Sequence, residues 1–159
     1  MTETTSFRLN GTDVSVAHET DETLLHVLRN RLDLYGTRFG CGLEQCGACM
    51  VLIDGRPRHA CTLPAEAVGG RTVTTIEGLA ADPVGKALLQ AFDEGQAGQC
   101  GYCLSGILIS AFALLKGSNR PGRTDIAAAL APHLCRCGAH PRILRAVERA
   151  AALTRTGAA

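Results

Sequence analysis

The sequence predicts an α+β protein made of two successive domains, the first rich in β-strands and the second helical. Hairpin signals crowd the first half of the 159-residue chain, and helical periodicity fills the second half. Eight cysteines also divide into two groups of four, one in each half. We expect the two domains to span residues 1–78 and 79–159.

Short strands account for most of the first domain. Asn10-Gly11 and Asp54-Gly55 are strong hairpin-turn signals, because both dipeptides adopt the positive φ angles of a tight turn and both lie between short β-prone segments. The turns predict two hairpins, and one more strand follows them before the strand signals stop. The expected strands cover residues 7–9, 14–16, 48–53, 56–60 and 71–76.

Helical patterns make up the rest. In the first domain, residues 23–32 place four leucines on one face, with Thr20 or Asp21 as the expected N-cap. That helix would pack on the sheet, as in ferredoxins. The second domain contains four helical patterns joined by brief links, which indicates a small bundle. These patterns cover residues 84–94, 104–116, 125–133 and 142–153.

The composition is that of a soluble globular protein. The chain is 46% hydrophobic and 19% charged, and its net charge of +1 provides no electrostatic reason to expect nucleic acid as a partner. We see no signal peptide, and the longest apolar run, Leu104–Leu115, is too short to insert in a membrane. We therefore expect a cytoplasmic chain; membrane association or export through a partner subunit stays open.

The first four cysteines have the spacing of a plant-type ferredoxin. Cys41, Cys46 and Cys49 follow C-x4-C-x2-C, and Cys61 comes a little further on. In ferredoxins this pattern holds one [2Fe–2S] cluster through four thiolates. Glycine next to the ligands would let the loop turn sharply and point its amides inward. Three glycines stand there: Gly40, Gly42 and Gly47.

The other four cysteines can converge on a second centre. Cys100 and Cys103 precede an apolar helix, while Cys135 and Cys137 lie between the last two helices. Ligands at helix ends would place this cluster inside the bundle, with a helix N-terminus near Cys103 to stabilise the thiolate charge. We therefore expect the second cluster to be less exposed than the first.

Eight cysteines could also serve other chemistry. Disulfides are disfavoured in a reducing cytoplasm, and two zinc ions are the main alternative to iron. Covalent c-type haem is excluded, because Met50 and Leu104 stand where a histidine would follow each C-x2-C. A zinc-bound interaction module therefore stays as an alternative.

Three motifs together resemble one family. They are GTRFGCGLEQCGACMVLIDG at residues 36–55, QCGYCLSG at residues 99–106 and LCRCGAHPRILRAV at residues 134–147. All eight cysteines fall in order, and the likeness covers nearly the whole chain. The chain resembles the small iron–sulfur subunits of molybdenum hydroxylases, the xanthine dehydrogenase and aldehyde oxidoreductase family.

This resemblance implies a fold and a set of partners. The first domain would be a β-grasp, plant-type ferredoxin-like domain and the second a four-helix bundle, each with one [2Fe–2S] cluster. A large subunit would hold the molybdopterin, with Gln99 and Cys137 at the positions that meet it. The first cluster would pass electrons to a flavin or a cytochrome c subunit.

One difference from the xanthine dehydrogenase-like members indicates which branch of the family this chain resembles. Cys103 is followed by Leu104-Ser105-Gly106, where xanthine dehydrogenase-like members usually have Thr-Pro-Gly. In this the chain is similar to the nicotinate, isoquinoline and bacterial aldehyde dehydrogenase branch, so the expected substrate of the complex is an aldehyde or an aromatic N-heterocycle. We expect no catalytic residue in this chain itself. The alternative function is a free-standing two-cluster ferredoxin.

Overall fold

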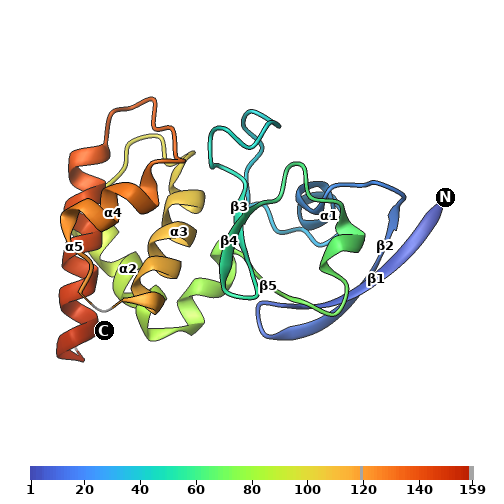
Figure 1. The fold of residues 1–159 in the computed structure, drawn as a ribbon, viewed down its shortest axis with the longest axis horizontal. Helices are drawn as coiled ribbons and strands as arrows, with labels where there is room; N and C mark the ends of the chain where they lie inside the picture. Colours follow the sequence, from blue (N-terminus) through green and yellow to red (C-terminus); the bar gives the residue numbers. More distant parts are fainter. Residues whose placement is uncertain (119, 158–159) are drawn as a thin grey trace.

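The computed structural model describes residues 1–118 and 120–157 and has an α+β architecture. The sheet lies at the N-terminal end of an elongated molecule and the longer helices lie at the other end (Figure 1). Five strands form one mixed sheet in the order β2-β1-β5-β3-β4, in which the β1–β5 pair is parallel and the other pairs are antiparallel. The strands are β1 (Thr2–Leu9), β2 (Thr12–Glu19), β3 (Met50–Ile53), β4 (Arg56–His59) and β5 (Thr72–Thr74).

Both predicted hairpin turns are present. Asn10 and Gly11 have φ angles of 49° and 88°, and Asp54 and Gly55 have φ angles of 50° and 78°. Two positive φ angles in a row define the tight turn whose twist matches that of the flanking strands. The first hairpin is longer than expected, because the pairing of β1 with β2 continues through polar residues as far as Thr2.

A short helix packs on one face of the sheet. Helix α1 (Leu24–Asn30) is capped by Thr23, whose hydroxyl accepts a hydrogen bond from the amide of His26. The expected cap at Thr20 or Asp21 is therefore wrong, because the chain is still turning away from β2 at those residues. The buried face of α1 packs with apolar residues of the strands: Leu24, Leu25, Val27 and Leu28 lie against Phe7, Leu9, Val16, Val51 and Val73.

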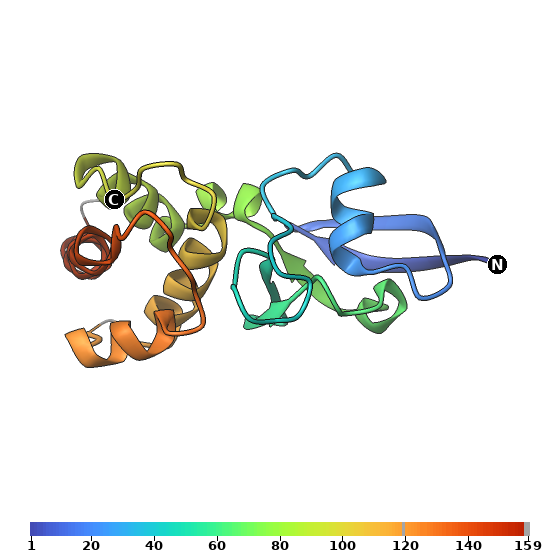
Figure 2. The ribbon, with the colours of Figure 1, turned by 90° about the horizontal axis from the view of Figure 1, so that it is seen from above.

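Four longer helices follow the sheet. Helix α2 contacts α3 and α5, and α4 also contacts α3 and α5, so the helices surround one apolar core (Figure 2). None of the helices in the described residues is long and apolar enough to cross a membrane. Two 3-10 helices, Ala65–Val68 and Ile76–Ala81, were not expected, because one or two turns are too short to show a detectable periodicity. The longer helices are α2 (Pro83–Glu94), α3 (Leu104–Gly117), α4 (Arg123–Leu130) and α5 (His140–Thr156).

Strand β3 connects the two parts. All four of its residues are buried. Val51 and Ile53 belong to the core under α1, whereas Met50 and Leu52 belong to the core of the helices. Successive side chains of a strand point to opposite faces, so β3 is covered by α1 on one face and by α3 on the other. The sheet and the helices therefore share a packed interface.

Candidate metal centres

The first cysteine set is built mostly from one loop. Cys41, Cys46 and Cys49 lie between α1 and β3, and Cys61 follows β4. Backbone amides turn inward on the sulfur atoms: the Cys41 amide donates to Cys46 Sγ (3.3 Å), and two later amides in the loop donate to Cys41 Sγ at 3.2–3.3 Å. Amides aimed at sulfur are the local environment that stabilises a thiolate.

Burial divides this set into an outer and an inner pair. The amides of Leu43 and Gln45 lower the pKa of Cys41, which is partly exposed beside Cys46, to about 7. Burial, followed by the neighbouring Cys61 thiol, raises the pKa of Cys49 to about 12. Cys41 therefore ionises close to neutral pH, whereas Cys49 needs a bound cation to remain a thiolate.

The glycines beside these ligands are required by the loop. Gly42 and Gly47 have φ angles of 69° and 73°, which side chains disfavour. A Cβ on Gly40 would lie 2.5 Å from Cys46 Sγ, and a Cβ on Gly47 would lie 2.3 Å from His133 Nδ1. At both positions a neighbouring side chain therefore approaches the backbone too closely for any residue except glycine.

The second set joins two loops at the ends of helices. Cys100 and Cys103 precede α3, with Cys103 as its N-cap residue, and Cys135 and Cys137 lie between α4 and α5. The Tyr102 amide lowers the pKa of Cys100, and the adjacent Cys137 thiol lowers it further. Burial, then the neighbouring Cys135 thiol, raises the pKa of Cys103 to about 12. This set has the same division into an outer and an inner pair.

The prediction that the second site is less exposed than the first is wrong for the isolated chain. Cys100 is exposed and none of the other three is fully buried, whereas Cys49 and Cys61 of the first site are buried. The loops that carry the second set lie at the helix ends (Figure 1), where Cys103 and Cys135 pack against the edge of the apolar core and remain partly exposed. Large apolar side chains beside it are also open to solvent, with Tyr102 47% and Leu134 65% exposed.

The thiols meet in four pairs, and this arrangement tests which metal fits. A tetrahedral zinc site would place its sulfur atoms about 3.8 Å apart, given Zn–S bonds of about 2.3 Å. Among the described residues, no three cysteine sulfurs lie within 4.8 Å of one another. A two-iron core needs two thiolates on each iron, which two pairs per site provide. The pairs are Cys41 with Cys46, Cys49 with Cys61, Cys100 with Cys137 and Cys103 with Cys135.

The two residues expected to meet a pterin lie together. The Gln99 side-chain amide donates a hydrogen bond to the Cys137 backbone carbonyl (3.3 Å), and Gln99 is exposed. Both residues therefore lie at the outer edge of the second site.

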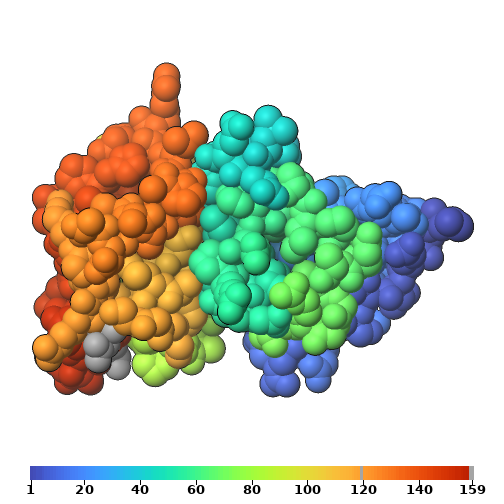
Figure 3. Space-filling model, viewed as in Figure 1, coloured from blue at the N-terminus to red at the C-terminus, as the bar shows by residue number. Residues whose placement is uncertain are grey.

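The two sites contact each other directly, which the sequence did not indicate. The Leu134 amide donates to the Cys46 carbonyl (3.0 Å), and the His133 ring packs on Gly47 while its Nε2 is 2.7 Å from Ser110 Oγ. Burial lowers the pKa of His133 to about 4, so this ring is neutral at pH 7. The loop of the first site and the loop after α4 lie side by side at one end of the interface (Figure 3). The one signal in the sequence for His133 and Leu134 is their position just before the ligand Cys135.

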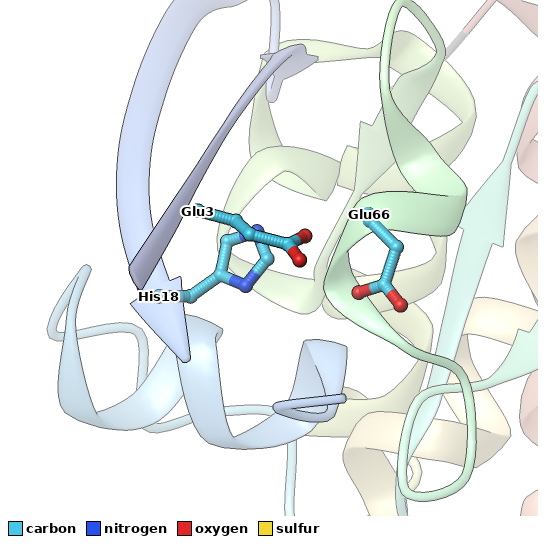
Figure 4. A group of neighbouring side chains, drawn as sticks. All are labelled: Glu3, His18 and Glu66. Carbon is cyan, nitrogen blue, oxygen red and sulfur yellow. The ribbon is translucent and has the colours of Figure 1, made fainter. Parts of the chain in front are cut away.

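A third group of possible ligands lies far from the cysteines in the sequence. Glu3, His18 and Glu66 come within 4.8 Å of one another on the sheet domain (Figure 4). His18 is buried, and both ring nitrogens are already engaged, Nε2 with Thr5 Oγ1 (2.8 Å) and Nδ1 with the Glu19 carbonyl (2.9 Å). Because both ring nitrogens of His18 are engaged, this group offers a metal no free imidazole ligand.

The fold and the paired thiols are those of an iron–sulfur electron carrier. Comparison with known proteins identifies its family. Residues 7–73 match a 2Fe-2S iron-sulfur cluster binding domain, and residues 75–148 match a [2Fe-2S] binding domain. The chain is 46% identical to a nicotinate dehydrogenase subunit of Pseudomonas putida, covering 95% of this chain and 96% of that one. It is 47% identical to the alpha subunit of isoquinoline 1-oxidoreductase of Brevundimonas diminuta, covering 91% and 95%.

A solved structure agrees with these relatives. Quinoline 2-oxidoreductase from Pseudomonas putida 86 has a chain that superimposes with a TM-score of 0.91 at 31% identity, covering 99% of both chains. The protein therefore belongs to the family of small 2Fe–2S subunits of molybdenum hydroxylases, and its role is electron transfer within an oxidoreductase. This confirms the resemblance drawn from the three cysteine motifs.

Proposed function

We propose that this chain carries single electrons from the molybdenum–pterin centre of a large subunit through two [2Fe–2S] clusters to an acceptor subunit. The second cluster would receive each electron and the first would pass it on. The clusters would be held by the two cysteine sets, Cys41, Cys46, Cys49 and Cys61 in a β-grasp domain of residues 1–78, and Cys100, Cys103, Cys135 and Cys137 in a four-helix bundle of residues 79–159.

The pairing of the thiols is the observation that carries this proposal. Each site offers an outer pair with a lowered thiol pKa at Cys41 or Cys100 and an inner pair with a raised one at Cys49 or Cys103. Two thiolates per iron is the ligand set of a [2Fe–2S] core. When bound, such a core accepts and releases one electron without binding substrate.

Metal analysis and EPR test the cluster content. We expect four irons and four labile sulfides per chain, and two distinct EPR signals in the reduced protein. Cys46→Ser should remove one signal and Cys135→Ser the other. Two irons per chain, or zinc in place of iron, would contradict the proposal.

The surface around the second site is the proposed contact with the large subunit. Residues 99–106 and 134–139 carry one charged side chain, Arg136, and expose Tyr102 and Leu134. Interface cores are depleted in charge and enriched in aromatic residues, so this surface suits a protein partner. Gln99 and Cys137 would face the pterin from it, and contact with the partner would shield the second cluster.

The partner contact can be tested by co-purification of the complex. Leu134→Glu places a charge in the proposed contact and should reduce, at least tenfold, the recovery of the large subunit. Leu43→Glu is a matched control, because Leu43 is 67% exposed beside the first site. Equal recovery with both variants would reject this surface. A wild-type chain isolated from its host as a stable monomer would favour the free-standing ferredoxin instead.

Substrate and acceptor follow from the relatives by analogy. The two relatives at 46% and 47% identity are named for nicotinate and isoquinoline, so an aromatic N-heterocycle is favoured over an aldehyde as the substrate of the complex. The acceptor would be a flavin or a cytochrome c subunit. Turnover of the purified complex with an N-heterocycle and with an aldehyde distinguishes the two substrate classes.

A further inference from the structure

A small cavity lies between the two cysteine sites. Its volume is about 150 Å³, and Cys46 of the first site lines it together with Cys100 and Cys103 of the second. The Tyr102 hydroxyl donates a hydrogen bond to the Phe39 carbonyl, which ties the second ligand loop to the first. Ligands of both clusters therefore face one shared junction.

Arg38 extends from the sheet domain to this junction. It lies three residues before Cys41, and its guanidinium carbon is 5.2 Å from the centre of the Tyr102 ring. Its Nε is buried without a hydrogen-bond partner, and no ion pair of Arg38 is found in residues 1–118 and 120–157. The stacking on Tyr102 fixes the guanidinium over the second ligand loop.

An arginine in this state needs a counter-charge. Guanidinium stays protonated in proteins, and a partly buried charge is costly when it has no partner. Four thiolates around an oxidised two-iron core leave a net charge of about −2 at each site, and reduction adds one more. Bound clusters would therefore supply the counter-charge that Arg38 lacks.

We propose that Arg38 is a positioning residue that raises the reduction potential of the second cluster and holds that cluster's loop against the first. This inference rests on the proposed function, since it assumes that both clusters are bound. With both clusters bound, one electron would pass from the reduced second cluster to the oxidised first cluster, with no bond or proton transferred. The Arg38 guanidinium would stabilise the negative charge of the reduced second cluster.

The test is an EPR-monitored redox titration of the purified complex. Arg38→Gln should shift the equilibrium of the second cluster toward its oxidised form about tenfold, which is about 59 mV for one electron. Arg38→Lys should restore most of the shift, because it keeps the charge. Arg56→Gln is the matched control, because Arg56 is an exposed arginine at the end of β4 away from Cys61.

Several results would overturn the proposal for Arg38. Unchanged potentials in Arg38→Gln protein that retains four irons would overturn it, as would an equal shift in Arg56→Gln. If Arg38→Gln protein does not assemble, Tyr102→Leu replaces it, because it removes the ring that positions the guanidinium. This variant should also lower the potential of the second cluster, and no change would overturn the proposal. Wild-type protein with fewer than four irons would instead contradict the proposed function.

Discussion

The two cysteine sites have the same division into outer and inner pairs but are assembled in different ways. Three ligands of the first site come from one loop whose own amides bind its sulfurs, and its inner thiols are buried in the sheet domain. The second site forms only when the ends of α3, α4 and α5 come together, and Cys100 stays exposed. A local motif therefore makes a nearly complete site, whereas a site made by helix packing leaves one side open to a partner.

The largest expected effect comes from weakening the helical core. Ile109 in α3 is fully buried, and Ile109→Ala should lower the free energy of unfolding by about 3–4 kcal/mol, since it deletes buried methyl groups and leaves a cavity. Because the second site depends on helix packing, its EPR signal should weaken while the first signal persists. Denaturant unfolding by circular dichroism and EPR of the reduced protein measure the two effects.

The control for Ile109→Ala lies in the sheet domain. Leu28 in α1 is also fully buried, so Leu28→Ala should cost a similar free energy and leave the second EPR signal intact. Equal loss of both signals in both variants would mean that the two domains unfold together and that the sites are not independently assembled.

A second prediction concerns the contact between the sites. A Cβ on Gly106 in α3 would lie 2.0 Å from the Gly47 carbonyl oxygen, so Gly106→Ala must push the first cluster loop away from α3. We expect a loss of about 2–3 kcal/mol in unfolding free energy and slower electron transfer between the clusters. Gly117→Ala, in the same helix, meets nothing within 4 Å and should raise the unfolding free energy by about 0.5–1 kcal/mol. Stopped-flow reduction would show equal rates in both variants if the contact were unimportant.

The smallest expected effect is the dependence of the unfolding free energy on the ionisation of Glu22 in the sheet domain. Burial would raise the pKa of Glu22, but hydrogen bonds from Arg31, the Glu19 amide and His26 outweigh it and bring the pKa from 4.5 to about 2. The folded state then binds fewer protons than the unfolded state, so this stabilisation is present above pH 4.5 and is lost as the pH falls toward 2. Because Arg31 is partly exposed, the contribution is about 1–2 kcal/mol.

Glu22→Gln tests this dependence. The variant should be less stable than wild type at pH 7, and the difference should narrow as the pH falls below 4.5. Thermal unfolding at a series of pH values measures it. Asp82→Asn tests the same kind of pH dependence in the helical domain. Hydrogen bonds from Lys116 and the Val84 amide outweigh burial and lower the pKa of Asp82. A constant gap between Glu22→Gln and wild type at all pH values would contradict the prediction.

Much of the fold followed from short patterns in the sequence. Asn10-Gly11 and Asp54-Gly55 formed the predicted turns, because tight turns require residues that accept positive φ. Helices α2 to α5 appeared close to their predicted ranges, since apolar periodicity directly reflects the buried face of a helix. The α1 cap and the two 3-10 helices were missed, because a cap and helices of four and six residues involve too few residues to form a pattern.

The sequence by itself determined the chemistry of the two sites, because ligand type and spacing along one loop are local properties. It placed Cys41, Cys46 and Cys49 on that loop, and the glycines it singled out are required there. Only the tertiary structure decided which thiols pair, that the second site is the more exposed, and that Arg38 lies over Tyr102 at the junction. Those features depend on contacts between residues far apart in the chain, and such contacts are set by how the helices and the sheet pack on β3.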